Sequence, residues 1–517
     1  MLSPRRPSGA LLGACAAGLT LGATLLLRAL TGLPSLSEVI GNGLALVMPG
    51  SVFGVLIDTL QERGRPLLLL GTSVFIVLVG AALGRWLRRS SWQAVTPDSA
   101  PPTVRKGRAL IRWLGPAVAL WLLTLPLIAL GEGSLADSAT ATALLDWLLL
   151  TGLIELLLDF PALGGSQPGR PDLAAPGTLP RRTFLAGAGG VIGAISLGYL
   201  GFNLLNASSP PVPRLNLGSA PGGPGDELPS GLTSTTDFYV VSKDLFGPPS
   251  VDASTWQLEV GGLHPYTLSY RELLALPHQT QIQTLECISN PVGGTLISTG
   301  IWRGVQLNGL LQRAGLPAGT KQLIFTCADG YTESLVIAQA TAPTTLVVDR
   351  LNGARLTAQH GFPARVLVVD HYGMKNPKWL TSIKPSPRPY LGYWEQQGWN
   401  AGAYPHIFSR FDFPSGNISL SAGRRYLLTG VAYAGTNGIS QVEVSVDGSR
   451  NWARAELRTP LSPYTWTLWS FPWNPAAGFY TLRVRARDGQ GNYQQPGQGQ
   501  SYPNGASGYQ QLTVLVR

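Results

Sequence analysis

Long apolar runs crowd the first 205 residues of this 517-residue chain and are scarce after them. A transmembrane helix needs about 20 mainly apolar residues to cross the hydrocarbon core of a bilayer. Six segments approach that length: Gly9 to Leu30, Ile40 to Leu60, Leu67 to Leu83, Leu114 to Leu130, Leu144 to Phe160 and Phe184 to Leu205. We therefore expect residues 1–180 to form an α-helical membrane region of about four or five spans, with a last span within residues 181–205.

Positive charge indicates the orientation of these spans. Seven Arg and Lys residues lie between Arg85 and Arg112, whereas the loop after the next span reads GEGSLAD. Because cytoplasmic loops are enriched in Lys and Arg, we expect the basic loop inside and everything after about residue 206 outside. The second segment is Gly-rich with Pro49 in its middle, so the number of crossings within residues 1–84 stays open. The net charge of +10 fits this topology better than a nucleic-acid partner, since no basic face with interleaved aromatic residues is present.

The last span begins with Pro180-Arg181-Arg182-Thr183-Phe184-Leu185 and continues as an Ala/Gly-rich apolar run. This start resembles a twin-arginine export signal, a route by which proteins cross the membrane already folded. An ordinary anchor with positive charge on the inside is the alternative. Residues 206–232 are rich in Pro, Gly and Ser and show no periodicity, so we expect a linker there.

Cysteine and histidine usage limits the redox groups. The three cysteines, Cys15, Cys287 and Cys327, form no C-x-x-C pair, and no histidine precedes His264. The membrane region therefore cannot supply a bis-histidine haem, and we expect neither haem nor an iron–sulfur cluster on this chain. Electrons must then pass to or from a separate partner or a small carrier.

Cys287 has the most suggestive setting of the three cysteines. It ends a short apolar run and is followed at once by Ser289-Asn290-Pro291 and then Gly293-Gly294. This pattern is typical of a strand followed by a turn. A thiolate there, beside backbone N–H groups that can approach an anion, suits a soft metal or a phosphorylated cofactor. The alternative is a buried structural cysteine in front of a loop.

Residues 233–414 show the mixed pattern of an α+β domain. Short strand-like runs such as TWQLEV, QLIFTC, TTLVVD and RVLVVD alternate with SYRELLAL and LNGLLQRAG. The last two place apolar residues at i, i+3 and i+4, which predicts helices.

The order of these stretches resembles a known family. TLECISN is followed by GIWRGVQLNGLL and then by HGFPARVLVVDHYGMKNPKWLTSI. This arrangement resembles the molybdopterin-binding domain of the sulfite oxidase family, and residues 415–517 resemble the immunoglobulin-like domain that follows it. The resemblance implies an enzyme with one molybdenum–molybdopterin cofactor per chain, and a homodimer formed through the C-terminal domain.

Several residues match the family's site. Cys287 takes the position of the thiolate that binds molybdenum, and we expect it to be catalytic. The matching cofactor-binding positions are Tyr239, Lys243, Asp329, His360, Arg365, Asn376, Pro377 and Lys378. A guanidinium fork fits a phosphate, and a histidine can donate to the pterin edge. Taken singly, Arg365 and Lys378 are equally typical of surface charges, His360 of a turn or core histidine, and Asp329 of a turn.

The chain departs from the oxidase pattern where that family binds sulfite. The family has a basic run after the cysteine, and this chain has Ile288-Ser289-Asn290-Pro291-Val292 there. The family's arginine near the domain start is replaced by Val241, and its tyrosine before the Asn-Gly turn is replaced by Asp349. Sulfite is therefore an improbable substrate. Other contacts to a substrate can come from Lys243, Lys375, Arg303, His371 and Tyr372. The aromatic segment from Tyr390 to Arg410 suggests packing between domains or a wall of the substrate funnel.

Residues 415–517 switch to strict alternation. Val442, Val444 and Val446 share one face of QVEVSVDGS, and Asp447-Gly448 predicts a hairpin turn. Several such strands predict an antiparallel β-sandwich.

These observations favour a membrane-anchored, multi-pass, extracytoplasmic molybdopterin oxidoreductase that performs two-electron oxygen-atom transfer on a small-molecule substrate. One alternative is a sulfoxide-type reductase of the same family, which the loss of the arginines favours. The other is a cofactor-free extracytoplasmic binding module. The joint presence of Cys287, His360, Arg365 and Lys378 argues against it, since a purely structural domain would not need all four.

Overall fold

The computed structural model describes residues 8–31, 35–48, 52, 64–93, 115–125, 138–159, 231–243, 248–416 and 418–517. The chain divides into two compact units, residues 1–48 with 62–208 and residues 49–61 with 209–517. The span expected at residues 184–205, the twin-arginine pair Arg181–Arg182 and most of the expected linker lie outside the described residues.

Helices form the described part of the first unit: α1 (Gly9–Thr31), α2 (Leu36–Val47), α4 (Gly64–Gln93), α6 (Ser138–Asp159) and an apolar helix over Gly115–Leu125. Glycines allow α1 and α4 to approach closely, because a Cβ atom on Gly13 would collide with the backbone of Gly80 and one on Gly9 with Gly84. Small residues at four-residue spacing are a common way for apolar helices to pack.

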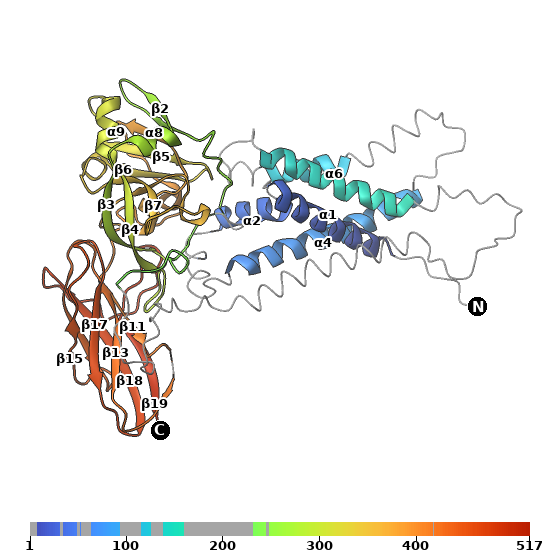
Figure 1. Cartoon of the computed structure of the whole chain (residues 1–517). Coiled ribbons are helices and arrows are strands. Elements are labelled where there is room, and N and C mark those ends of the chain that lie inside the picture. Colours follow the sequence, from blue (N-terminus) through green and yellow to red (C-terminus); the bar gives the residue numbers. More distant parts are fainter. Residues whose placement is uncertain are drawn as a thin grey trace, which may run out of the picture. The chain divides into compact units, whose positions relative to one another are not determined.

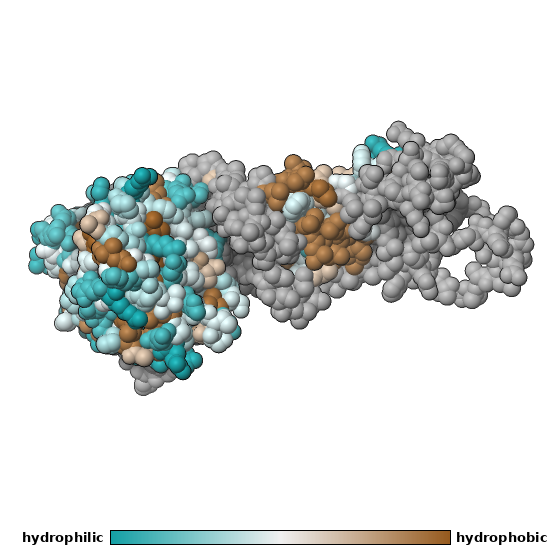
Figure 2. All heavy atoms as spheres, turned by 90° about the horizontal axis from the view of Figure 1, so that it is seen from above, coloured by the Kyte–Doolittle hydropathy of each residue, from teal (hydrophilic) through white to brown (hydrophobic). Residues whose placement is uncertain are grey.

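Apolar side chains are exposed on these helices. Leu78 on α4 is 62% exposed and Leu123 is 72% exposed, and Figure 2 shows apolar residues gathered on the helical surface. Within the described residues, one stretch, Leu70–Arg89, is long and apolar enough to cross a membrane. Shorter apolar stretches, Gly9–Leu25, Gly115–Leu125 and Ala143–Ile154, lie within the other described helices. Within the residues that the structure describes, the structure therefore supports one span, and the multi-span region that we expected finds no support there.

The second unit begins with an α+β domain, as predicted (Figure 1). One sheet has the strand order β2-β1-β10-β5-β6, and another has the order β3-β4-β7-β8 with β9 beside β7. The strands are β1 (Gln257–Val260), β2 (Tyr266–Ser269), β3 (Gln279–Glu286), β4 (Ile297–Gln306), β5 (Gln322–Cys327), β6 (Thr332–Val336), β7 (Leu346–Leu351), β8 (Ala354–Arg355), β9 (Arg365–Leu367) and β10 (Leu380–Ser386).

Short helices join these strands. They are α8 (Tyr270–Ala275), α9 (Leu307–Ala314), the 3-10 turn η3 (Ala358–His360), η4 (Gly373–Lys375), α10 (Ile337–Ala340) and α11 (Tyr393–Gln396). The two predicted helical pieces form α8 and α9. Ser269 caps α8 through a capping box with Glu272, which explains why the helix begins there. The apolar side of α9 is buried through Leu307, Leu310 and Leu311.

The remaining strands form a β-sandwich. One sheet has the order β11-β13-β17-β16 and the other β12-β19-β18-β14-β15. The strands are β11 (Phe408–Phe413), β12 (Ser419–Leu420), β13 (Tyr426–Tyr433), β14 (Ile439–Ser445), β15 (Ala453–Arg454), β16 (Glu456–Leu457), β17 (Thr467–Trp473), β18 (Gly478–Asp488) and β19 (Gln510–Val516). The predicted alternation is confirmed at Val442 and Val444, which are buried. β11 pairs with β13, so the sandwich begins before the expected boundary at residue 415.

The sandwich covers the strand that carries the cysteine. β3 is the edge strand of its sheet, and its Thr284 is bonded on the free side by Tyr464 and Trp466. The amide of Thr284 donates to the Tyr464 carbonyl at 3.0 Å, and Thr284 Oγ1 accepts from the Trp466 amide at 2.9 Å. Arg410 of β11 donates to the Gly294 carbonyl at 2.8 Å. The loop after Cys287 is therefore held by both domains.

Candidate functional site

Cys287 follows directly on the last residue of β3, where the sequence predicted a strand end. Its amide donates to the Leu296 carbonyl at 2.9 Å, which continues the β3–β4 pairing by one residue. Its Sγ lies 3.1 Å from Ser289 Oγ, and the side chain is buried. The thiol is thus fixed in position at the end of a rigid strand.

The loop after Cys287 is closed by Asn290. The Asn290 amide donates to the Cys287 carbonyl at 2.9 Å, and its Oδ1 accepts from the Leu296 amide at 3.0 Å. Gly294 donates to the Pro291 carbonyl, and Gly293 has a φ of 72°, which favours glycine. Three amides of this loop are therefore used inside it, so the loop does not offer them to an anion as the sequence suggested.

Glu286, the residue before the cysteine, was not singled out from the sequence. Its Oε1 accepts from Asn290 Nδ2 at 2.9 Å, and its Oε2 has no hydrogen-bond partner. Burial raises the pKa of this carboxyl to about 8, although the Asn290 bond and Arg410 oppose the shift. At neutral pH Glu286 is mainly protonated. Both faces of β3 are covered at its end, which strand alternation alone does not reveal.

Arg365 begins β9 and is the most informative of the expected cofactor residues. Its Nη2 donates to the Asn376 carbonyl at 2.9 Å, and Nη1 lies 3.4 Å from the His360 carbonyl. Its Nε is buried without a partner. In the part of the chain that the structure describes, no carboxylate is ion-paired with it. A buried guanidinium with a spare donor and no counter-ion fits an anionic group such as a phosphate.

Burial lowers the pKa of Arg365 to about 10, while Tyr239 and Cys327 act in the opposite direction. The group still carries its charge at neutral pH. The Arg365 Cζ lies 5.3 Å from the ring centroid of Trp302, which supports one face of the guanidinium.

His360 lies in η3 beside Arg365 and is buried. Its Nε2 lies 3.0 Å from the Thr235 carbonyl, which can only accept, so Nε2 carries the proton and donates. Burial lowers the pKa of the ring to about 4, so the imidazole is neutral. Nδ1 is then an acceptor. The ring fits an N–H donor of a pterin and does not provide the donor that we expected.

Asn376, Pro377 and Lys378 follow η4 and brace this part of the site. Asn376 Oδ1 accepts from the Val368 amide at 2.8 Å, and the Pro377 carbonyl accepts from the Val366 amide at 2.9 Å. Lys378 Nζ donates to the carbonyls of Val241 and Gln359 at 3.0 and 3.1 Å. Lys378 therefore joins the 239–243 segment to η3.

The remaining expected residues also lie here. Tyr239 is partly buried, and its pKa is raised mainly by burial, with Cys287 adding to the shift and Arg365 opposing it, so both groups lie within electrostatic range of its hydroxyl. Asp329 accepts from the Tyr331 amide at 3.0 Å in the turn after β5. Cys327 is within electrostatic range of Asp329, Lys243 and Arg365. The fold thus brings the expected residues together around Cys287, Arg365 and Cys327.

Other suggested contacts have structural partners. Arg303 pairs with the buried Asp349 at 3.1 Å. Lys375 is enclosed by Glu333 and Glu395. His371 lies within hydrogen-bond distance of the Val369 carbonyl and of Gln339, and Tyr372 Oη accepts from the His406 amide at 3.0 Å.

An apolar cluster lies beside the cysteine. It consists of Ile288, Tyr372, Met374, Trp399 and Ala403, with Trp394 and Tyr502 packed against it. The Trp399 ring stands edge-on to Tyr502 of the sandwich at 5.2 Å, so this segment packs between the two domains. It also reaches Ile288, the neighbour of Cys287. Trp399 Nε1 is buried without a partner.

Comparison with known proteins gives two family matches. Residues 246–394 match the oxidoreductase molybdopterin binding domain, and residues 414–501 match the Mo-co oxidoreductase dimerisation domain. The first range contains Cys287, Asp329, His360, Arg365 and Lys378.

Curated relatives are similar to parts of the chain. The uncharacterized oxidoreductase YuiH of Bacillus subtilis is 29% identical over 187 residues, which cover 36% of this chain and 91% of that protein. The putative protein-methionine-sulfoxide reductase subunit YedZ1 of Azospira oryzae is 36% identical over 154 residues, 29% of this chain and 56% of that protein. Sulfite oxidase of Arabidopsis thaliana is 27% identical, covering 42% of this chain and 70% of that protein.

Proposed function

We propose that this chain, a molybdenum-dependent oxidoreductase with a molybdopterin-binding domain and a Mo-co dimerisation domain, holds molybdenum through Cys287 and acts on an uncharged substrate. One observation carries the cofactor assignment. A buried thiol at a strand end and a buried guanidinium without a counter-ion among the described residues both lie within electrostatic range of the Tyr239 hydroxyl. A soft sulfur ligand and an anion site are the two features that a phosphorylated molybdenum cofactor needs.

The residues around these two groups have separate tasks. Arg365 binds the phosphate of the cofactor with the donors that the protein leaves available. Neutral His360 accepts from the pterin, while Lys378 and Asn376 hold the surrounding backbone in place. The molybdenum centre, when bound, supplies two-electron oxygen-atom transfer. Ile288, Met374 and Trp399 exclude water beside Cys287.

Charge supports an uncharged substrate. The positions that would carry positive charge toward sulfite hold Val241, Asp349 and the Ile288 run. Lys375 is enclosed by the carboxyl groups of Glu333 and Glu395, and Arg303 is paired with Asp349. A sulfite dianion would therefore meet an apolar cluster without a counter-charge, and its desolvation would go uncompensated.

Metal and pterin analysis of the full chain tests the cofactor assignment. We expect near-stoichiometric molybdenum and pterin in protein from a host that makes the cofactor. Cys287→Ser should change the molybdenum spectrum and abolish turnover. Cys15→Ser is the control, since this thiol is also buried but lies on α1 in the helical unit, and it should leave the spectrum unchanged. Folded protein with neither metal nor pterin would refute the proposal.

Reduction of sulfoxides is a second candidate. The apolar cluster with Met374 and Trp399 suits a thioether or sulfoxide, and the relative YedZ1 is described as a putative protein-methionine-sulfoxide reductase subunit. Assays in both directions separate the two candidates. Turnover of sulfoxides with a reduced dye, without oxidation of the thioether by an electron acceptor, would favour the reductase.

The cellular setting belongs to the same proposal. The apolar first unit, with the Leu70–Arg89 stretch, supports attachment to a membrane. The charge bias around the apolar segments supports a catalytic domain on the extracytoplasmic side. The dimerisation domain supports a homodimer, and a separate protein or small carrier would exchange the electrons. Protease accessibility in sealed vesicles of known orientation tests the sidedness, and light scattering tests the dimer.

A further inference from the structure

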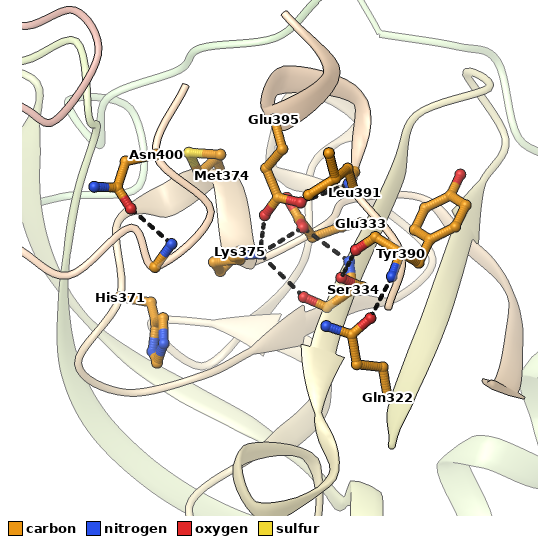
Figure 3. A network of polar contacts seen from close by, with 12 residues as sticks. Gln322, Glu333, Ser334, His371, Met374, Lys375, Tyr390, Leu391, Glu395 and Asn400 are labelled. Atoms are coloured by element: carbon orange, nitrogen blue, oxygen red, sulfur yellow. Dashed lines mark hydrogen bonds and ion pairs between the residues drawn. The ribbon is translucent and has the colours of Figure 1, made fainter. Parts of the chain in front are cut away.

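A buried cluster of three charged side chains connects the cofactor side of the domain to the aromatic segment. Lys375 of η4 lies between Glu333 of β6 and Glu395 of α11 (Figure 3). The exposed fractions of these side chains are 6%, 0% and 1%. Lys375 Nζ donates to Glu333 Oε1 at 2.9 Å, to the Ser334 carbonyl at 3.2 Å and to Glu395 Oε1. All three N–H groups of the Lys375 ammonium therefore donate hydrogen bonds.

Two carboxyls share this single ammonium group. Glu395 Oε2 also accepts from the Gly392 amide at 2.6 Å, which anchors the start of α11. Glu333 Oε1 accepts a second bond from the Ser334 amide at 2.8 Å. The groups that face Glu333 from the packed elements are Lys375, Glu395 and Tyr331, with Cys327 on β5 nearby. Two buried negative charges with one positive charge leave an uncompensated charge, which burial disfavours.

The hydrogen bonds of Tyr331 indicate which carboxyl group carries a proton that would remove this uncompensated charge. Tyr331 Oη lies 3.0 Å from Glu333 Oε2 and 2.8 Å from the Met374 carbonyl. A phenol has one hydrogen and cannot donate to both acceptors. Both contacts are satisfied only if Glu333 is protonated at Oε2 and donates to Tyr331 Oη, while Tyr331 donates to Met374.

We propose that Glu333 holds one proton near neutral pH and that this proton sets the position of the loop 373–378. With the proton present, the chain of donors runs from Glu333 through Tyr331 to the Met374 carbonyl. When Glu333 releases its proton to solvent, Tyr331 turns its hydrogen to Glu333 and Met374 loses its donor. The cluster then carries one additional negative charge. Glu333 is a positioning residue in this account, because it acts through Tyr331.

The loop is placed so that the change reaches the site. Met374 packs in the apolar cluster with Ile288 and Trp399, and Asn376 and Lys378 lie two and four residues further along. Burial raises the pKa of Glu333 to about 7, with Glu395 adding to the shift and Lys375 opposing it, so the proton is bound and released near neutral pH. This role of Glu333 does not depend on the substrate proposed above.

Infrared difference spectroscopy of the full chain in detergent tests the proton directly. From about pH 5 to about pH 9, wild type should lose the carbonyl band of a buried protonated carboxyl as the pH passes through neutrality. Glu333→Gln should lack the part of this change that comes from Glu333, because the amide donates to Tyr331 at every pH, whereas the buried carboxyl of Glu286 still contributes its own band. Glu443→Gln removes a carboxyl that pairs with Arg485 on the sandwich, and this control should retain the change. A change of equal amplitude in Glu333→Gln would overturn the proposal.

Hydrogen exchange at residues 373–378 tests the coupling. After correction for the intrinsic pH dependence of exchange, these amides should lose protection above neutral pH in wild type and keep it in Glu333→Gln. If Glu333→Gln does not fold, Tyr331→Phe carries the test, since removal of its partner must shift the carboxyl band of Glu333. An unshifted band, or loop protection independent of pH in wild type, would overturn the coupling. Molybdenum content measured on the same samples separates this outcome from failure of the cofactor assignment.

Discussion

Replacement of Arg365 by Met should separate binding of the cofactor from stability of the fold. Arg365 is buried, has no carboxylate partner among the described residues, and leaves Nε without an acceptor. A buried arginine that serves the fold is normally paired. A buried arginine that binds an anionic cofactor destabilises the cofactor-free protein, because its charge is desolvated without compensation.

The pKa provides the magnitude. The lowering of the Arg365 pKa to about 10 is equivalent to about 3 kcal/mol of disfavour for the charged form, at about 1.4 kcal/mol per pKa unit. Methionine removes that cost and retains much of the volume. It also leaves the carbonyls of Asn376 and His360 without their donor, which costs about 1–3 kcal/mol each for a buried group. The two effects oppose each other, about 2–6 kcal/mol lost against about 3 kcal/mol gained, so we expect the unfolding free energy of the cofactor-free protein to fall by at most about 3 kcal/mol.

Arg410 provides the matched control. It is equally buried, but it pairs with Asp412 at 2.8 Å and bonds to the Gly294 carbonyl. Arg410→Met breaks a buried ion pair and should cost about 3–5 kcal/mol.

The assay compares full-length protein from hosts with and without the cofactor, by thermal unfolding in detergent and by molybdenum and pterin content. Arg365→Met should lose most of its cofactor and, when cofactor-free, unfold closer to the wild-type temperature than Arg410→Met does. Arg410→Met should unfold earlier with or without the cofactor. Full cofactor content in Arg365→Met, or a stability loss as large as that of Arg410→Met, would refute the reasoning.

Three further predictions concern stability. The folded pKa of His360 is lowered from 6.5 to about 4, so its contribution is complete above pH 6.5 and is lost as the pH falls toward 4. A pH series of unfolding temperatures should therefore be flatter in His360→Gln, and parallel profiles would contradict this. Gly430→Ala should prevent correct packing of the sandwich, because a Cβ would overlap the Arg410 carbonyl and lie 2.6 Å from Trp469; a native near-ultraviolet spectrum would be evidence against it. Gly13→Leu should disrupt the contact with Gly80 and lower the unfolding temperature of the helical unit, whereas Gly71→Leu, with open space around it, should not.

Much of the fold could be predicted from local pattern. Alternation placed Val442 and Val444 inside the sandwich, and apolar spacing located α8 and α9. The strand end at Cys287 was predicted from the apolar run and the turn residues that follow it. These features depend on neighbours within a few residues, which a sequence displays directly. For the membrane region we expected several spans, and within the described residues one stretch, Leu70–Arg89, has the length and composition of a span.

The residues of the candidate site were largely predicted from the sequence, but their protonation states and hydrogen-bonding roles were not. Cys287, His360 and Arg365 were expected together, and the structure places them around one site. The sequence did not show that His360 is an acceptor, because that depends on a bond to Thr235, which is distant along the chain. It also did not identify Glu286, whose burial comes from the sandwich covering β3.

By itself the sequence determined the strands, the helices, the cysteine at a strand end and the residue types that suit a molybdenum cofactor. Only the tertiary structure decided which of those residues are charged and which donors remain available. Glu333, Lys375 and Glu395 come from three separate elements, and each is an ordinary surface type of residue when read alone. Packing places them in a common environment of low polarity, where a single proton decides the net charge. That environment is built by contacts between distant residues, so no local pattern in the sequence records it.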